Sequence, residues 1–220
     1  MKKGIRQYLE QLQASGIKEI YHTKQPIILS PVAGDKLNQL LEKQETYKNC
    51  QKCPLSAGRI KFVYGEGNPD ATCMVIGEAP GDQENQTGRP FVGRAGQLLD
   101  KMLLAINIRR EDVYIANIVK CRPPGNRNPE QSERLACLPY LHEQIEIIQP
   151  KIFLFMGLVS AQTLLETKKP MHELRETYHN YMERPAYVTY HPSALLRNEN
   201  WKRPAWEDLQ KFQKVYESLL

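Results

Sequence analysis

The sequence predicts a three-layer α/β/α fold, in which a central four-stranded parallel sheet lies between helices, together with a helical extension at the N-terminus. Short runs of apolar and β-branched residues alternate with helical patterns along most of the chain, as in parallel sheets whose strands are joined by helices. The strand runs are apolar throughout, which is typical of strands covered on both faces. The 220 residues are enough for one such domain and an appendage.

The four strands are expected at residues 72–77, 112–119, 151–157 and 187–190. Between and around them, apolar residues recur with helical spacing; the expected helices are 35–47, 95–106, 129–148, 158–166 and 206–220. Asn128 is a suitable N-cap for the helix that starts at 129, because Pro129 then occupies the first helical position. Trp201 and Trp206 are expected to be packing residues near the last helix.

Residues 1–31 are expected to form an extension with one helix at 2–14, and residues 32–220 to form the main domain. The chain is 41% hydrophobic and 25% charged, which is ordinary for a globular protein. No apolar run approaches the length of a membrane span, and the segment "MKKGIRQYLEQLQ" lacks the apolar region of a signal peptide. We therefore expect a cytoplasmic protein with no membrane partner. The net charge of +5 permits a polyanionic partner without requiring one.

Polar motifs follow three of the predicted strands: "GEAPG", "NIVKCRPPGNRNP" and "YHPSALLRN". Ligands of open α/β sheets bind beyond the carboxyl ends of the strands, so these motifs predict one shared site. Asn117 is unusual inside a buried strand, because a buried amide requires hydrogen-bond partners. His191 ends a strand at the same edge, and Phe91 lies in the glycine-rich loop "GRPFVG". Phe91 is also compatible with an ordinary core position, and Glu78 with capping its own loop.

Five cysteines are present, and Cys73 lies in an apolar strand, where it is expected to be a core residue. The C-x2-C pair is a common half-site for zinc or for an iron–sulfur cluster. Only one such pair exists here, and two further cysteines come from separate elements. That pattern favours an iron–sulfur cluster over zinc. The alternative without a metal is that these cysteines are unrelated free thiols. The four cysteines are Cys50, Cys53, Cys121 and Cys137.

The motifs "GEAPG", "GRPFVGRAGQLLD", "NIVKCRPPGNRNP" and "HPSALLR", in this order and with these cysteines, resemble the family 4 uracil-DNA glycosylases, the iron–sulfur branch of that superfamily. The resemblance runs from about residue 48 to the C-terminus and leaves residues 1–31 unassigned. It implies a monomeric DNA repair enzyme that flips uracil out of single- or double-stranded DNA. Such an enzyme hydrolyses the N-glycosidic bond, releases free uracil and leaves an abasic site.

The resemblance also implies residue roles. Cys50, Cys53, Cys121 and Cys137 match the ligands of a [4Fe–4S] cluster. Phe91 matches the aromatic that stacks on uracil, Asn117 the amide that reads its edge, and His191 the histidine that supports the departing uracil anion. Leu195 matches the wedge that enters the DNA stack, although Leu196 is a second candidate. The remaining expected substrate contacts are Gly77, Ala79, Ser193 and Arg197.

The residue that orients the attacking water is left open. Better-known uracil glycosylases have an aspartate where Ala79 stands. The candidates here are Glu78, then Glu84, and also Asp82, because a carboxylate near the sugar helps glycosidic hydrolysis.

Three other functions compete with the glycosylase. A DNA-binding module with a degenerate site conflicts with the intact Glu78, Asn117 and His191. A relative that forms a covalent adduct with the abasic sugar would carry a histidine in the loop after the second strand, and "KCRPPGNRNP" has none. A zinc-stabilised hydrolase of small nucleosides would need no polymeric DNA.

Overall fold

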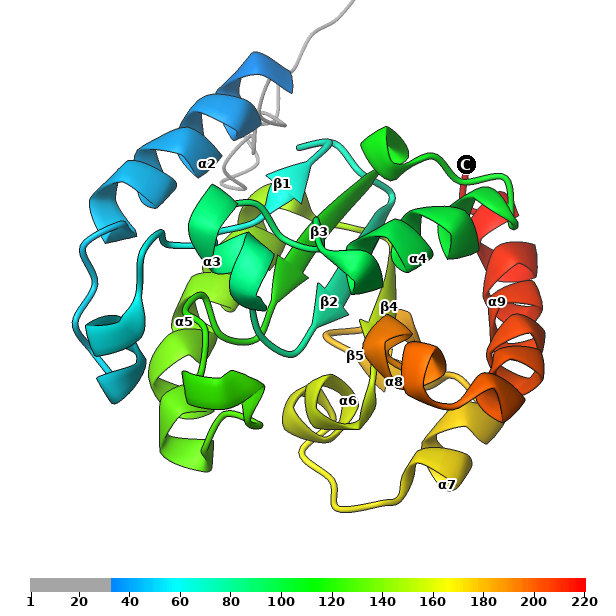
Figure 1. The fold of residues 1–220 in the computed structure, drawn as a ribbon. Helices are drawn as coiled ribbons and strands as arrows, with labels where there is room; N and C mark the ends of the chain where they lie inside the picture. Colours follow the sequence, from blue (N-terminus) through cyan, green and yellow to red (C-terminus); the bar gives the residue numbers. More distant parts are fainter. Residues whose placement is uncertain (1–32) are drawn as a thin grey trace, which may run out of the picture. The chain divides into compact units, whose positions relative to one another are not determined.

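The computed structural model describes residues 33–220. Their sheet has six strands in the order β1-β3-β2-β4-β6-β5 (Figure 1). The four central strands are mutually parallel, which confirms the predicted parallel sheet. They are β2 (Cys73–Gly77), β3 (Val113–Asn117), β4 (Ile152–Met156) and β6 (Arg184–Thr189).

Two short edge strands were not predicted. β1 (Glu66–Gly67) pairs antiparallel with β3, and β5 (His179–Tyr181) pairs antiparallel with β6. The sequences "EG" and "HNY" are too short and too polar to show the alternation that marks a strand. The sheet is therefore mixed, with a parallel centre and antiparallel edges.

Alternate residues of each central strand enter two separate cores. In β2, Met74 and Ile76 pack into one core, and Cys73 and Val75 into the other. Side chains of α2 (Ala33–Tyr47), α5 (Gln131–Ile148), α6 (Leu158–Leu164) and α7 (Met171–Glu176) contribute to the first. The second contains residues of α4 (Arg94–Leu104), α8 (Pro192–Arg197) and α9 (Lys202–Glu217). The sheet thus lies between two helical layers, as predicted (Figure 1).

The five long predicted helices correspond to α2, α4, α5, α6 and α9. The helices α3 (Asp82–Thr87), α7 and α8 were missed, since six residues are too few to show a helical period. Four 3-10 turns complete the helical structure of the described residues: η1 (Pro54–Gly58), η2 (Arg110–Asp112), η3 (Pro124–Asn126) and η4 (Glu199–Trp201).

The start of α5 differs from the prediction. Its N-cap is Glu130 rather than Asn128. The Glu133 carboxylate accepts a hydrogen bond from the Glu130 backbone N–H (2.7 Å) and pairs with Arg127. This capping box satisfies the first free amide of the helix, and it fixes Arg127 beside the site described below.

The predicted helix at 2–14 and the extension 1–31 lie outside the described residues. Within residues 33–220, no helix is both long enough and apolar enough to cross a membrane.

Candidate active site

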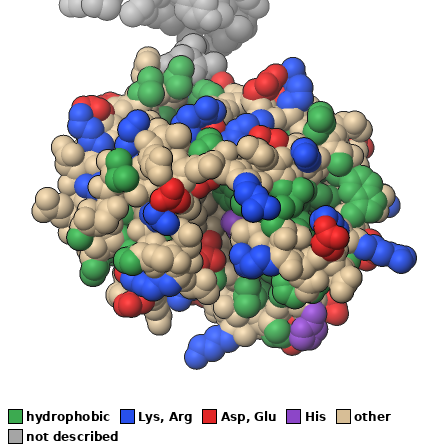
Figure 2. Space-filling model, viewed as in Figure 1, with side chains coloured by type: hydrophobic (Ala, Val, Ile, Leu, Met, Phe, Trp, Pro, Cys, Tyr) green, Lys and Arg blue, Asp and Glu red, His purple; other side chains and the backbone are tan. Residues whose placement is uncertain are grey.

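A cavity of about 490 Å³ opens beyond the carboxyl ends of the central strands. Figure 2 shows a hollow in the middle of this face, with Lys and Arg side chains around it and a histidine inside it. The cavity brings together side chains from all three motifs that the sequence singled out. The predicted site residues that line it are Glu78, Ala79, Glu84, Phe91, Asn117, His191, Ser193 and Arg197.

The Phe91 ring is held close to the end of β2. A Cβ added at Gly77 would lie 2.5 Å from Phe91 Cζ and would overlap Asn117 Oδ1. Only glycine permits this approach. Phe91 is itself in the left-handed backbone region, with a φ of 50°, which is uncommon for a bulky residue. The surrounding structure must therefore impose this conformation.

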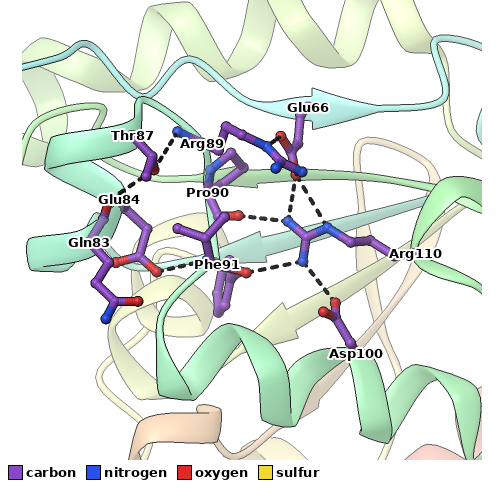
Figure 3. Close-up of polar contacts among 10 residues, drawn as sticks. Glu66, Gln83, Glu84, Thr87, Arg89, Pro90, Phe91, Asp100 and Arg110 are labelled. Carbon is purple, nitrogen blue, oxygen red and sulfur yellow. Dashed lines mark hydrogen bonds and ion pairs between the residues drawn. The ribbon is translucent and has the colours of Figure 1, made fainter.

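One side of the Phe91 loop is fixed by Glu84 (Figure 3). Its Oε1 accepts hydrogen bonds from the backbone N–H groups of Val92 and Gly93, both at 2.9 Å. Its Oε2 accepts from the Gly81 N–H at 3.1 Å. Both carboxylate oxygens are thus bound to backbone amides, so the position of Glu84 suits it to hold the loop rather than to orient water.

The other side of the loop is fixed by Arg110 (Figure 3). Its guanidinium donates to the carbonyls of Pro90 (2.7 Å) and Phe91 (3.1 Å). Glu66 on β1 and Asp100 on α4 accept from the same guanidinium at 2.7 and 2.8 Å. Because Arg has a rigid planar fork of donors, the two carboxylates fix the direction in which it meets the loop. Sequence reasoning missed Arg110, since nothing in a charged "RRED" turn distinguishes it from a surface residue.

Asn117 ends β3 and is buried. Its Oδ1 has no hydrogen-bond partner among the described residues. Buried acceptors without partners are rare in proteins, and each calls for an explanation. This oxygen belongs to a side chain that lines the cavity, so it is available to a donor on a bound molecule.

His191 is the N-cap of α8, and its ring centroid lies 5.4 Å from that of Phe91. Its Nδ1 accepts a hydrogen bond from the Ser193 backbone N–H at 3.2 Å. The Ser193 hydroxyl also lies 2.8 Å from Nδ1. With Nδ1 as the acceptor for the backbone amide, which can only donate, the neutral ring carries its proton on Nε2. Burial, with a smaller contribution from Arg197, lowers the pKa of His191 to about 4. The ring is therefore a neutral donor at physiological pH.

Of the candidate carboxylates, Glu78 is best placed for chemistry. It is half-buried and lines the cavity. Burial raises its pKa to about 7, although Arg134 and Arg197 oppose the shift. Asp82 is exposed, outside the cavity lining, and bound to Arg122 and Gln86.

The two candidates for the wedge, Leu195 and Leu196, differ in burial. Leu195 is only 2% exposed and packs in the second core, whereas the neighbouring Leu196 is 41% exposed. The side chains of a short helix point in different directions from one residue to the next. Leu196 is the large apolar side chain of this helix that is exposed to solvent.

Cys121 and Cys137 are buried members of the first core, and the partly buried Cys50 and Cys53 pack against it. The four are close enough to influence one another's pKa. Burial raises the pKa of the Cys121 thiol, and Cys53 and Cys50 raise it further. Burial likewise raises the pKa of Cys137 to about 12. In the described part of the chain, no three His, Cys, Asp or Glu side chains are close enough to hold a single metal ion.

Several donors face these sulfur atoms. The Lys52 N–H lies 3.4 Å from Cys50 Sγ, and the Lys120 N–H lies 3.3 Å from Cys137 Sγ. Arg59 Nη1 lies 3.6 Å from Cys121 Sγ. Hydrogen bonds to sulfur are a known feature of iron–sulfur sites, and a multi-iron cluster spreads its ligands further apart than one ion does. The four cysteines and the donors that face them are compatible with an iron–sulfur cluster.

The structure also corrects the expectation for Trp201. It lines the cavity and is 39% exposed, so it is not simply a packing residue. Its neighbour in the wall, Tyr190, directly precedes His191. Sequence analysis missed this wall, although the position of Tyr190 next to His191, at the end of a predicted strand, could have indicated it.

Comparison with known proteins places this chain in a family. A profile of the uracil DNA glycosylase superfamily matches residues 64–210. The type-4 uracil-DNA glycosylase of Pyrobaculum aerophilum is 44% identical over 181 residues, which cover 79% of this chain and 92% of that protein. Type-4 uracil-DNA glycosylases of Thermotoga maritima and Archaeoglobus fulgidus are 44% and 37% identical, each over 76% of this chain and 89% and 88% of their own lengths. The chain therefore belongs to the uracil DNA glycosylase superfamily.

Proposed function

We propose that this chain removes uracil from DNA by hydrolysing the bond between the base and its deoxyribose, which releases free uracil and leaves an abasic site. The observation that carries the proposal is the unpartnered Oδ1 of Asn117, buried at the cavity beside the Phe91 ring. The superfamily match and the type-4 relatives support the same activity. The function is assigned to residues 32–220, and the role of residues 1–31 is left unassigned.

Recognition of uracil follows from two side chains. The base must leave the duplex to become accessible, and the Phe91 ring then supplies a flat surface for stacking. Asn117 Oδ1 accepts from uracil N3–H, while its amide NH2 donates to O4. Cytosine presents the reversed pattern at these positions. A cytosine in the cavity would leave buried polar groups unpaired, which is a strong basis for rejection.

Bond cleavage leaves negative charge on uracil and positive charge on the sugar. The Nε2–H of His191 is the donor that stabilises the uracil anion at O2, which is the kind of fixed dipole that lowers a barrier most effectively. Glu78 supports the positive sugar and orients the attacking water. A carboxylate with a pKa of about 7 is well matched to this task near neutral pH. Glu84 acts as a positioning residue for the Phe91 loop.

Four residues around the cavity are proposed to contact the DNA strand. Arg127 and Arg197 are exposed cationic residues in the cavity wall. The Ser193 hydroxyl lies 2.8 Å from His191 Nδ1 and would turn away from it to donate to a phosphate. Such groups bind phosphates without reading sequence. Leu196, rather than Leu195, is the apolar side chain that enters the space left by the flipped base.

Cys50, Cys53, Cys121 and Cys137 are proposed to hold a [4Fe–4S] cluster. When bound, the cluster supplies a structural cross-link and positive charge that keeps the four cysteines as thiolates. It ties the segment after α2 to the loop after β3 and to α5. That loop carries Arg127 into the cavity wall. We further propose a cytoplasmic monomer that acts on uracil in single- or double-stranded DNA.

A direct test is incubation with an end-labelled oligonucleotide that carries one uracil, followed by hot alkali. The expected result is a cut at the uracil, lost in Asn117→Ala and His191→Ala and retained in His142→Ala, a histidine outside the cavity. Binding without cutting would instead support a DNA-binding module. A protein–DNA adduct that survives denaturation would support the covalent alternative. Equal cleavage of free deoxyuridine would support a nucleoside hydrolase.

A further inference from the structure

One wall of the cavity consists of two stacked aromatic side chains that uracil recognition does not use. The rings of Tyr190 and Trp201 lie 4.9 Å apart between centroids, with an interplanar angle of 14°. Both residues line the cavity. Trp201 is the outer member, since it is 39% exposed and Tyr190 is half-buried. An indole with much of its surface exposed beside a ligand cavity is an open stacking surface.

A buried ion pair holds this stack in place. The Arg175 guanidinium lies 4.6 Å from the Tyr190 ring centroid. Asp208, whose side chain is 3% exposed, binds Arg175 through both oxygens at 2.7 and 2.9 Å and also accepts from Thr189 Oγ1 at 2.8 Å. The Pro204 carbonyl accepts from the same guanidinium at 2.6 Å. A guanidinium fixed in this way holds the tyrosine ring by a cation–π contact, so the aromatic wall is preorganised.

The cavity has room for more than one base. Its volume is about 490 Å³, within the range that accommodates drug-sized ligands, and uracil is a single six-membered ring. Phe91, Asn117 and His191 account for one pyrimidine. Arg127 and Arg197 line the same cavity and supply positive charge for the phosphates on either side of that base.

We propose that the exposed face of Trp201 is a second base subsite, which stacks on the unpaired nucleobase next to uracil in single-stranded DNA. The inference rests on the proposed glycosylase function. Aromatic platforms beside cationic residues are how proteins hold single strands without reading sequence. In a duplex the neighbouring base stays paired and stacked within the helix, so it does not reach this surface. The subsite is therefore specific to the single-stranded substrate.

The chain offers a matched control. Trp206 is 38% exposed, nearly the same as Trp201, and lies in α9 outside the cavity lining. Trp201→Ala, Trp201→Phe and Trp206→Ala would be compared on a single-stranded oligonucleotide with one uracil. We expect Trp201→Ala to raise KM about tenfold, in line with the loss of one base–aromatic stack, with kcat changed less than about twofold. Trp201→Phe should recover most of the loss, and Trp206→Ala should behave as the parent.

Substrates with abasic spacers identify the occupant. A spacer replaces the base on the 5′ side, the 3′ side or both sides of uracil. For the parent protein, one of these spacers should raise KM by the same factor as Trp201→Ala, and combining spacer and variant should add nothing further, as expected for two partners in one contact. On the uracil-containing duplex, Trp201→Ala should have less than about a twofold effect.

Additive effects of spacer and variant would overturn the subsite, because the indole and the neighbouring base would then act independently. An equal fall in kcat on every substrate would also overturn it, because Trp201 would then act through Tyr190 and His191. If the parent protein cut none of these substrates, the proposed function would fail and the subsite with it. If the parent and Trp201→Ala cut every substrate equally well, the second base subsite would be rejected and the proposed glycosylase function would stand.

Discussion

At the scale of single residues, the site depends on a side chain that Gly77 lacks and on a hydrogen-bond partner that Asn117 lacks within residues 33–220. Gly77 lacks a side chain where Phe91 and Asn117 meet the end of β2. Asn117 lacks a partner for its Oδ1 among the described residues. The second feature is costly unless a ligand uses it, since an unpaired buried acceptor costs about 1–3 kcal/mol. This cost explains why the polar amide within the apolar run "IANIV" is informative in the sequence alone.

Gly77→Ala tests the close approach. The added Cβ would overlap Asn117 Oδ1 and lie 2.5 Å from Phe91 Cζ, so it should displace both groups that define the base pocket. We expect at least a hundredfold loss of kcat/KM for uracil excision, with a circular dichroism spectrum like that of the parent. Gly58→Ala is a suitable control, because nothing lies within 4 Å of its added Cβ. Full activity in Gly77→Ala would contradict the described pocket.

The pH dependence of excision tests the role of Glu78. Burial raises the pKa of Glu78 to about 7, and the proposed role requires the ionised form. The rate of the chemical step should therefore rise between pH 6 and pH 8. Burial lowers the pKa of His191 to about 4. His191 therefore stays neutral over this range and should cause no second change in the rate as the pH varies. Single-turnover rates should lose the rise in Glu78→Gln, and a persistent rise there would assign the titration to another group.

At the scale of elements, the loop that carries Phe91 is held by groups from four different elements of the fold. Glu84 in α3 binds its amides, and Arg110 in η2 binds its carbonyls while it pairs with Glu66 and Asp100. None of these contacts has a local sequence signature. The sequence indicated a rigid loop from its glycines and prolines, but the residues that make it rigid come together only in the folded chain.

Arg110→Ala tests this arrangement. It leaves two backbone carbonyls and two carboxylates without their shared donor, so we expect a stability loss of about 1–3 kcal/mol and a fall in kcat/KM of about tenfold. Arg110→Lys should restore charge and most of the stability but not the excision rate, because a single ammonium cannot reproduce the planar fork. Arg109→Ala is the control, since Arg109 is exposed and bound to Asp112 and Glu111. Equal excision by Arg110→Lys and the parent would contradict a positioning role.

The helix α8 places the core residue Leu195 next to Leu196, the proposed DNA contact. Leu195→Ala should destabilise the protein by about 2–5 kcal/mol, the usual cost of a buried leucine. Leu196→Ala should leave the melting temperature nearly unchanged and reduce excision from duplex DNA more than from single strands. Thermal melts and rates on both substrates distinguish the two variants. If Leu195→Ala instead kept its stability and lost excision from duplex DNA, Leu195 would be the wedge.

At the scale of the whole molecule, the fold was predictable and its edges were not. The four central strands and five long helices carry strong apolar patterns, because each is buried against another layer. The edge strands, the three six-residue helices and the true N-cap of α5 at Glu130 depend on contacts distant in sequence. The site shows the same contrast between local and long-range features. Its motif residues were predicted from the sequence, and the stack of Tyr190 and Trp201 was not.

Loss of the proposed cluster should lower the stability of the whole domain. Cys137 lies in α5 and is buried, and Cys50 follows α2, so removing one ligand should loosen both elements. Cys137→Ser is expected to lose visible absorbance from thiolate-bound iron and to lower the melting temperature, with excision lost at a lower temperature than in the parent. Cys73→Ser, which alters a core cysteine away from the other four, should keep the iron content. Unchanged iron in Cys137→Ser would remove that residue from the ligand set.

The way in which the cavity holds a base is the central claim, and a crystal structure of the protein with uracil tests it directly. The predicted result is a uracil ring stacked on Phe91, with N3–H donating to Asn117 Oδ1 and O2 accepting from His191 Nε2. Uracil bound elsewhere, or bound here with Asn117 Oδ1 still unpartnered, would contradict this mode of recognition.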